Sequence, residues 1–136
     1  MNIRTMTAVL GLGMAVAAAG CSSAGDCCGG GGATRGVVRH VVLFKFKDGA
    51  SADQVKAVEE KFRALKSRIP QIQDLEWGTN VSPENHAQGF THCFFLTFKD
   101  AAARDAYLPH PAHKEFGASL GPVLDKVLVV DYVSKD

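Results

Sequence analysis

Hydrophobic and polar positions alternate with two different periodicities along residues 37–136, one typical of strands and one typical of helices. Four runs that are rich in β-branched and aromatic side chains predict strands, and they span residues 37–46, 72–81, 90–98 and 123–133. After the first run, apolar residues recur at spacings of three and four, which is typical of a helix with one buried stripe; they are Val55, Val58, Phe62, Leu65 and Ile69. A second helical region is expected between the third and fourth strands.

Local signals set the boundaries of both helical regions. Ser51 and Gln54 have the spacing of a capping box, in which the hydroxyl and the amide each satisfy one backbone N–H group. Pro70 ends the first helix, because proline cannot continue it. Asp100 is placed to cap the second helix over residues 101–108.

Pro109 interrupts the second helix, and His110-Pro111 is expected to restart it, because proline is favoured at the first helical position. Gly117 and Gly121-Pro122 then punctuate the chain before the last strand. The element order is β-α-β-β-α-β. It predicts an α+β, ferredoxin-like fold with the helices on one face of an antiparallel sheet.

Several strands carry apolar side chains on both faces, so a sheet covered by helices on one face only would leave apolar surface exposed. Leu43 adjoins Phe44, Phe94 adjoins Phe95, and residues 127–130 are all apolar. An antiparallel sheet with one solvated face should alternate more cleanly. Exposing such side chains would forfeit about 1.5–3 kcal/mol each. We therefore expect a second copy of the chain to cover the free face, giving a homodimer.

The charge balance excludes a nucleic-acid-binding role of the usual electrostatic kind. Arg4 is the only charged side chain among the first twenty residues, so removing it from 15 basic residues leaves 14, against 14 acidic residues. Composition is ordinary for a globular protein, with 46% hydrophobic and 21% charged residues. A neutral domain without a basic run provides no footprint for DNA or RNA.

Residues 1–20 have the features of an export signal. An uncharged apolar run from Met6 to Ala19 follows Arg4, and it has the length of a signal-peptide core rather than of a membrane span. Ala18-Ala19-Gly20-Cys21 resembles a bacterial lipobox, although Ala18 replaces the usual leucine. We expect Cys21 to be lipidated and the protein to be anchored to a membrane of the cell envelope, on its periplasmic or extracellular face. Plain secretion and a retained anchor are the alternatives.

The mature chain then divides into a linker and one domain. Residues 21–36 contain the lipidated cysteine and a Gly/Ser-rich segment typical of a flexible tether. Cys27 and Cys28 are adjacent, which disfavours a bridge between them and leaves intermolecular pairing, modification or a metal clip open. Cys93 lies in a predicted strand and is expected to be a buried hydrophobe. The domain spans residues 37–136.

The domain resembles the stress-responsive dimeric α/β barrel, or Dabb, family. The resemblance is carried by these segments: Arg39-His40-Val41-Val42-Leu43-Phe44-Lys45-Phe46-Lys47, Trp77-Gly78, Gly89-Phe90-Thr91-His92, Tyr107-Leu108, His110-Pro111-Ala112-His113, Val129 and Asp131-Tyr132. It covers nearly all of the mature domain. It implies a dimer in which two sheets close a barrel, in agreement with the two-faced strands.

The resemblance also implies candidate site residues. In a plant polyketide cyclase of this family, a histidine acts as base and a tyrosine positions the substrate, and these roles would fall to His113 and Tyr107. The other side chains expected at a ligand are His40, His92, His110, Phe94 and Phe116. Phe94 stands where a roomy pocket would need a smaller residue. An exported protein is also not expected to meet a cytosolic polyketide, and most members of the family have no established reaction.

The residues themselves leave three functions open. Imidazoles beside a phenol could take a proton next to a carbonyl group, because the histidine pKa lies near neutral pH. His40 and His92 could instead be satisfied core residues, and His110 a helix-start device. The chain is thus a module that binds a small apolar ligand or is associated with stress, a cyclase- or isomerase-like enzyme, or a purely structural unit. We expect neither a cofactor nor a metal site.

Overall fold

The computed structural model describes residues 36–135, and its elements follow the predicted order. They are β1 (Val38–Phe46), α1 (Ala52–Arg68), β2 (Ile72–Thr79), β3 (His92–Phe98), α2 (Ala101–Tyr107), α3 (Pro111–Ser119) and β4 (Leu124–Val133). The ferredoxin-like α+β prediction is confirmed. The predicted signal peptide, the lipidated Cys21 and the linker up to residue 35 lie outside the described residues.

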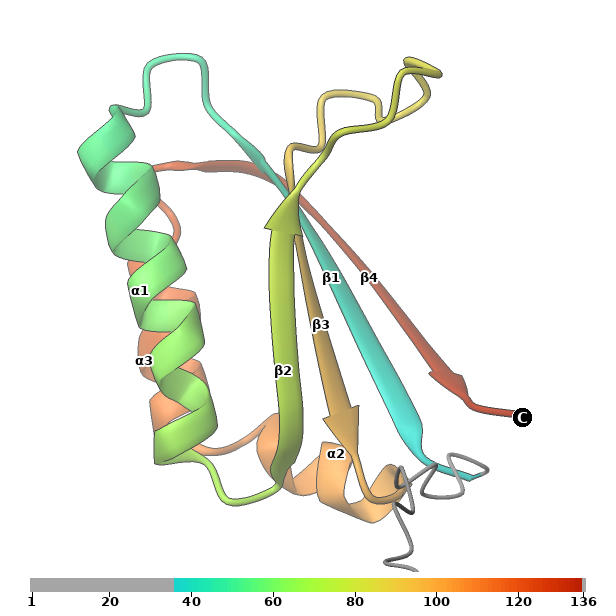
Figure 1. The fold of residues 1–136 in the computed structure, drawn as a ribbon. Helices are drawn as coiled ribbons and strands as arrows, with labels where there is room; N and C mark the ends of the chain where they lie inside the picture. The colour runs from blue at the N-terminus through green and yellow to red at the C-terminus, as the bar shows by residue number, and fades with distance from the viewer. Residues whose placement is uncertain (1–35, 136) are drawn as a thin grey trace, which may run out of the picture. The chain divides into compact units, whose positions relative to one another are not determined.

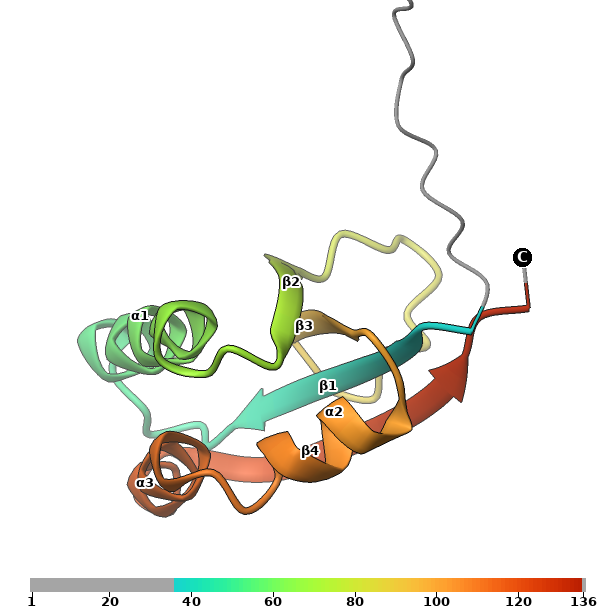
Figure 2. The same cartoon turned by 90° about the horizontal axis from the view of Figure 1, so that it is seen from below.

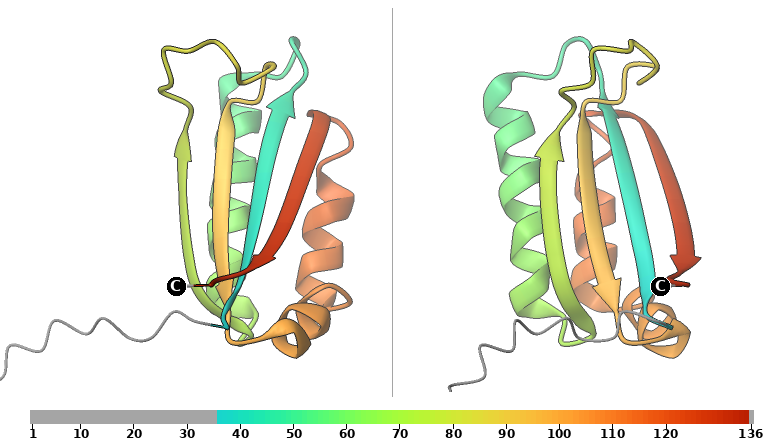
Figure 3. Two further views of the ribbon diagram at one scale, coloured as in Figure 1. Left: turned by 90° about the vertical axis from the view of Figure 1, so that its right-hand side faces the viewer. Right: turned by 45° about the vertical axis from the view of Figure 1, so that its right-hand side comes forward.

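The four strands form one antiparallel sheet in the order β2-β3-β1-β4. Figure 1 shows α1 and α3 side by side along one face of this sheet, with α2 at its lower end. Seen from below, the strands and the helices form two layers (Figure 2). The other face carries no helix and is seen directly in the left view of Figure 3. We call it the open face.

The capping residues act as the sequence predicts. Ser51 accepts a hydrogen bond from the Gln54 backbone N–H, and the Gln54 side chain accepts one from the Ser51 N–H. The Asp100 carboxylate accepts from the Ala103 N–H at 2.8 Å, which starts α2. Because Pro109 has no N–H to donate, the second helical region splits into α2 and α3.

Three boundaries differ from the prediction by two residues or more. The second strand ends at Thr79 rather than at residue 81, and Val81 is exposed in the following loop. The third strand begins at His92, because the N–H of Phe90 turns back to the Ala87 carbonyl. Gly117 does not end a helix, since α3 continues through it to Ser119. A glycine is tolerated there because helix packing offsets its weak helix propensity.

The core lies between the helices and the inner face of the sheet and is dominated by aromatic rings. Phe44 on β1 is nearly inaccessible to solvent, and its ring centroid lies 5.3 Å from that of Phe94 and 5.8 Å from that of Phe62. Phe116 on α3 closes the cluster at 6.4 Å from Phe44. The buried stripe of α1 is therefore held against β1 and β3 by ring contacts.

The open face is apolar over much of its area, as the two-faced strands predict. Leu43 and Phe95 are half-buried there, while Leu128 and Val130 on β4 are 42% and 48% exposed. Cys93 also points to this face, paired with Leu43, so it is half-buried rather than part of the core. In the single chain Cys93 is therefore less buried than expected, because alternation along β3 assigns the positions under the helices to His92 and Phe94.

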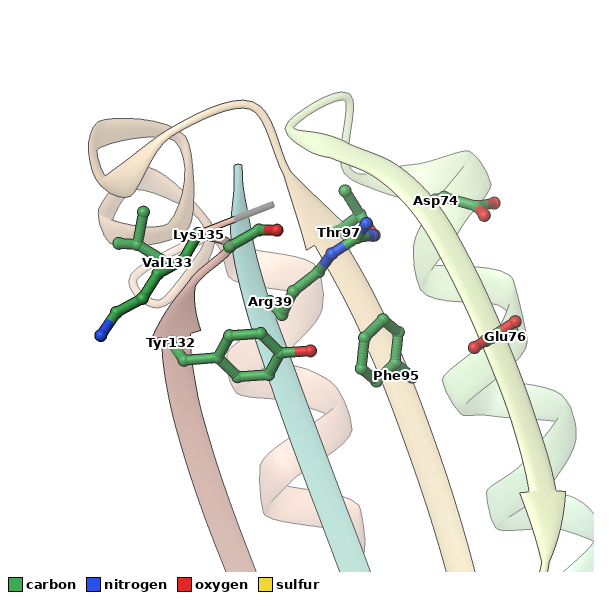
Figure 4. Close-up of a pocket in the computed structure, with 9 residues that line it drawn as sticks. Arg39, Asp74, Glu76, Phe95, Thr97, Tyr132, Val133 and Lys135 are labelled. Carbon is green, nitrogen blue, oxygen red and sulfur yellow. The ribbon is translucent and has the colours of Figure 1, made fainter. Parts of the chain in front are cut away.

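Two hollows mark the open face. One, of about 590 Å³, lies at the end of the sheet where Arg39 donates to the Thr97 hydroxyl and stacks over the Phe95 ring. Figure 4 shows Tyr132 beside this group, with two carboxylates on β2. The other hollow, of about 380 Å³, lies at the opposite end, where Leu43, Cys93 and Leu128 meet the loop between β2 and β3. Both continue the surface that we expect a second copy to cover.

Charge introduced on the open face should break self-association. We expect the Val130→Glu domain to dimerise roughly a hundredfold or more weakly than wild type, because an uncompensated buried charge costs about 3–5 kcal/mol. Val81→Glu is the matched control, since Val81 is 91% exposed in a loop. Sedimentation equilibrium checks both variants. A wild-type domain that stays monomeric at micromolar concentration contradicts the prediction.

Candidate functional site

A small cavity lies on the helix side of the sheet, between α3 and the pair β1 and β4. Its volume is about 200 Å³. Its lining residues are His40, Val42, Phe44, Phe62, Tyr107, Leu108, His113, Phe116, Gly117, Leu120, Val127 and Val129. The walls are therefore apolar, and the polar groups are two imidazoles and one phenol. Val127 and Val129 are about half exposed, so the cavity opens toward solvent along β4.

His40 is held in a fixed orientation by a carboxylate. Its Nδ1 lies 2.5 Å from Oδ1 of Asp131, the residue that pairs with it on β4. An ionised carboxylate only accepts hydrogen bonds, so Nδ1 of His40 carries the proton and Nε2 is the acceptor. Arg104 from α2 donates to the other oxygen of Asp131. The carboxylate is thus held from both sides.

Burial and charge act in opposite directions on His40. Desolvation is the larger influence and lowers the pKa of His40 below its usual value, while the hydrogen bond and charge of Asp131 raise it. His113 and Arg104 lower the pKa of His40 further, through their positive charges. The imidazole of His40 is therefore neutral at physiological pH, and its Nε2 can accept a proton.

His113 and Tyr107 form a contacting pair in the same cavity. Their ring centroids lie 4.3 Å apart. Nδ1 of His113 donates to the Leu108 carbonyl at 3.0 Å, because a carbonyl oxygen only accepts, so in the neutral tautomer Nε2 is the acceptor. Burial, followed by the charge of Asp131, raises the pKa of Tyr107 above its usual range. The phenol therefore stays protonated and can donate a hydrogen bond.

The local sequence explains why these groups meet. Tyr107 is the last residue of α2, and Pro109 breaks the helix just after it. His113 lies in the first turn of α3, which lets its Nδ1 reach back to the carbonyl at the break. His40 faces the helices by strand alternation and pairs with Asp131 across the sheet. The arrangement combines two imidazoles, each with its Nδ1 held by an acceptor so that Nε2 faces away from that partner, with one phenol that can donate a hydrogen bond.

The predicted site residues divide into two groups. Tyr107, His113, His40 and Phe116 line the cavity. His110 does not: it caps α3, with its Nδ1 accepting from the Ala112 N–H at 3.2 Å, as the structural alternative proposed. The roles assigned to these residues stay predictions.

His92 and Phe94 lie apart from the cavity. His92 faces the helices by alternation along β3, but its Nε2 lies 3.0 Å from Glu59 of α1 and its Nδ1 lies 2.8 Å from the Thr91 hydroxyl. Phe94 is fully buried in the aromatic core. Both belong to β3, whereas the cavity lies over β1 and β4. Strand parity gives the face of a residue and not its lateral position.

Asp131 and Arg104 were given no role from the sequence. Asp131 interrupts the apolar alternation of β4 on the helix-facing side, between Val129 and Val133. That interruption is the signal that could have identified it, because a carboxylate at a core-facing position needs a partner. Arg104 carries no such signal on a short helix.

No cation site emerges from the part of the chain that the structure describes. Within residues 36–135, no three histidine, cysteine, aspartate or glutamate side chains are placed to hold a metal ion.

No helix within residues 36–135 is long and apolar enough to cross a membrane.

The sequence matches a known domain family and several characterised relatives. The family profile of the stress-responsive A/B barrel domain, Dabb, matches residues 38–134. The chain is 42% identical over 98 residues to the stress-response A/B barrel domain-containing protein HS1 of Arabidopsis thaliana, covering 72% of this chain and 90% of that protein. It is 32% identical over 98 residues to olivetolic acid cyclase of Cannabis sativa, covering 72% and 97%.

Solved structures show the same fold. The hydroxynitrile lyase of Passiflora edulis superposes with a TM-score of 0.71 at 28% identity, covering 75% of this chain and 96% of that one. A dimeric ferredoxin-like protein from Jannaschia sp. CCS1 superposes with a TM-score of 0.64 at 27% identity, covering 73% and 100%. Two further structural neighbours of this fold are also described as dimeric.

Removal of the Asp131 charge should lower the pKa of His40 further. The carboxylate raises that pKa against burial, so we expect Asp131→Asn to shift the His40 titration to lower pH. An NMR titration of the imidazole resonances measures this shift. Glu115→Gln is the control, because Glu115 pairs with Arg68 at the surface. A His40 pKa that rises in Asp131→Asn contradicts the proposed balance of forces.

The lowered pKa of His40 also determines how the stability of the domain changes at acidic pH. The unfolded chain binds more protons at His40 than the folded domain in the window just below about pH 6.5. The contribution of His40 to stability is therefore fully present above that pH and is lost as the pH falls toward the pKa of the folded state. In urea unfolding across this range, the midpoint urea concentration should decrease as the pH is lowered. The decrease should be smaller in His40→Gln than in the wild type.

Proposed function

Because the chain belongs to the stress-responsive A/B barrel (Dabb) family, we propose that it is a homodimeric module that binds a small, largely apolar molecule with one carbonyl group. The observation that carries this proposal is the cavity beside Tyr107 and His113, whose walls are apolar and whose polar atoms gather around the tyrosine. Small-molecule sites commonly combine apolar walls with a few convergent polar groups.

The polar groups suit a carbonyl oxygen. A protonated phenol donates a hydrogen bond, and the raised pKa of Tyr107 keeps that proton in place. Nε2 of His113 and Nε2 of His40 are both acceptors in the neutral tautomers that their partners select. The carbonyl oxygen of a ligand only accepts hydrogen bonds, so it would bind the phenol. The apolar part of the ligand would then pack against Val42, Phe116 and Leu120.

The dimeric state of the module is supported by two independent observations. The open face of the isolated chain is apolar over β1, β3 and β4. Structural neighbours of the same fold are described as dimeric. A second copy placed against the open face would leave the cavity on the helix side of each subunit.

The tautomers of the two histidines favour an enzymatic function as the second candidate. His113 could take a proton from the carbon next to a carbonyl group through Nε2, while Tyr107 donates a hydrogen bond to the carbonyl oxygen as it gains negative charge. The product of this step is an enolate, which regains a proton at the same carbon. Relatives named olivetolic acid cyclase and hydroxynitrile lyase show that this fold supports enzymes.

Proton exchange on a simple ketone separates the two candidate functions. Wild-type protein in D₂O should bind butanone and accelerate replacement of the protons next to its carbonyl by deuterium, which NMR follows. We expect His113→Ala to slow this exchange roughly 100-fold, the scale of one general base. Tyr107→Phe should slow it while weakening binding by less than about tenfold, since one hydrogen bond is lost.

The exposed loop residue His86 supplies the control, and His86→Ala should match wild type. If butanone binds but no exchange occurs, the binding function is retained and the enzymatic function is rejected. Exchange that persists unchanged in both cavity variants would place the chemistry elsewhere.

We also propose that the module is tethered to a membrane of the cell envelope through Cys21. The support is the apolar run of residues 6–19, the small residues before Cys21 and the Gly/Ser-rich spacer that follows. Two acyl chains hold a protein stably at a bilayer, whereas one chain does so poorly. The spacer would let the domain dimerise while both anchors stay in the membrane.

Lipidation can be checked on the full chain expressed in a bacterium. Wild-type protein should sediment with membranes and incorporate labelled palmitate, and Cys21→Ser should lose both properties. Cys27→Ser is the matched control, because it removes a nearby cysteine without touching the lipobox, and it should behave as wild type. Membrane association that survives in Cys21→Ser without label would indicate a retained anchor instead.

A further inference from the structure

A hydroxyl, an imidazole and a carboxylate are joined in series where β3 begins. Nδ1 of His92 lies 2.8 Å from the Thr91 hydroxyl, and Nε2 of His92 lies 3.0 Å from Oε1 of Glu59. An ionised carboxylate only accepts hydrogen bonds, so Nε2 carries the proton. In the neutral tautomer, Nδ1 then accepts the hydrogen bond that the Thr91 hydroxyl donates. The proposed ketone site uses none of these three residues.

The imidazole of His92 is held by two aromatic rings as well as by Glu59. Phe46 meets it edge-on at 5.0 Å between centroids, and Trp77 lies parallel to it at 6.4 Å. His92 is buried, whereas Thr91 is exposed. A hydroxyl within hydrogen-bond reach of a base, which a third group orients in turn, is the arrangement of an activated nucleophile.

Thr91 lines a pocket that is separate from the cavity beside Tyr107. The pocket has a volume of about 380 Å³, and none of its described lining residues belongs to that cavity. Most of the lining comes from the loop between β2 and β3 and from the adjoining strand ends. Figure 1 shows this loop at the end of the sheet opposite α2. Leu43, Phe90 and Leu128 supply apolar surface, so the pocket suits a small, largely apolar molecule.

A hydrogen-bond donor stands across the strands from Thr91. The Asn80 N–H donates to the Thr91 carbonyl at 2.8 Å, one residue beyond the pairing of Thr79 with His92, so the side chains of Asn80 and Thr91 are neighbours. The Asn80 side-chain oxygen accepts from the Ser82 N–H at 3.0 Å, and its NH₂ group is a donor. Asn80 lines the same pocket. Such a donor stabilises a carbonyl oxygen that gains negative charge under attack.

Cys93 is a second nucleophilic residue at this pocket. It follows Thr91 by two residues and also lines the pocket. Burial, followed by the charge of Glu76, raises the pKa of the Cys93 thiol, so the thiol keeps its proton and is a poor nucleophile. The Thr91 hydroxyl has the acceptor Nδ1 of His92 beside it. Thr91 is therefore the favoured nucleophile.

We propose that Thr91, His92 and Glu59 form a second active site that hydrolyses small, apolar carboxylic esters through an acyl-threonine intermediate. Oγ1 of Thr91 attacks the ester carbonyl carbon while its proton passes to Nδ1 of His92. The bond between that carbon and the alcohol oxygen then breaks, and the leaving alcohol takes the proton from His92. Glu59 holds the imidazole and offsets its positive charge while it carries the proton.

Water completes the reaction. His92 takes a proton from a water molecule that attacks the acyl-threonine ester, and the departing Thr91 oxygen receives that proton as the carboxylic acid is released. Thr91 and His92 are thus regenerated, and the ester has been split into an acid and an alcohol. This activity goes beyond the proposed binding of a ketone and does not depend on it.

Acylation of the full chain by p-nitrophenyl acetate tests the proposal. Wild-type protein should release p-nitrophenolate in a burst. Acid quenching during the burst should trap one acetyl group, which peptide mass spectrometry should locate on Thr91. Thr91→Val should lose this adduct, and Thr91→Ser should retain it because the hydroxyl is restored. Thr91 is exposed, so both variants should fold and keep the test decisive.

Further variants examine the role of each partner. His92→Gln should slow acylation roughly 100-fold, the scale of one general base, and Asn80→Ala by about the same factor, the scale of one oxyanion donor. Glu59→Gln should slow it less than His92→Gln, because the base remains but is less well oriented. Ser67→Ala is the matched control and should react as wild type, since the exposed Ser67 hydroxyl donates to the Ala64 carbonyl on α1.

Three results would overturn the proposal. They are a wild-type chain that is never acetylated, an adduct on a lysine or on Cys93 in place of Thr91, and an adduct whose rate is the same in Thr91→Val. Wild type and Val130→Glu should be acylated equally, because Thr91 and Asn80 lie where the strands leave the sheet. Acylation in Val130→Glu alone would mean that a second copy closes the pocket, and would reject this activity for the dimer.

Discussion

Helices cover only one face of a sheet whose strands are apolar on both faces. This constraint governs the rest of the structure. On the covered face, α1 contributes a stripe of apolar residues to a core of stacked rings centred on Phe44 and Phe94. On the open face, leucine, valine and phenylalanine side chains stand partly in water. The hydrophobic effect that folds the domain is therefore incomplete in a single chain.

The cavity lies where the helical layer is least complete. Seventeen residues of continuous helix form α1, whereas the other helical region is broken at Pro109 into pieces of seven and nine residues. The break exposes the carbonyl of Leu108, which His113 satisfies, and it leaves β4 only partly covered. The interruption that weakens packing thus also creates a concave site and orients the imidazole within it.

The charges around the cavity balance, so hydrogen-bonding groups are available in its walls without a net charge. Asp131 bridges His40 and Arg104, so the one carboxylate near the cavity is neutralised by an arginine and bound to an imidazole. Burial favours the neutral forms of both His40 and Tyr107. Acceptors and a donor are therefore available without a buried unpaired ion, whose cost would be several kcal/mol.

The sequence by itself determined the element order, the helix caps, the two-faced strands and the family, because these depend on local spacing and on periodicity along the chain. Tertiary structure alone decided which histidines share a cavity. His40 and His92 have the same parity and similar burial, yet strand order puts one beside Asp131 and the other beside Glu59. Lateral position in a sheet is set by pairing between strands distant in sequence, and no local pattern encodes it.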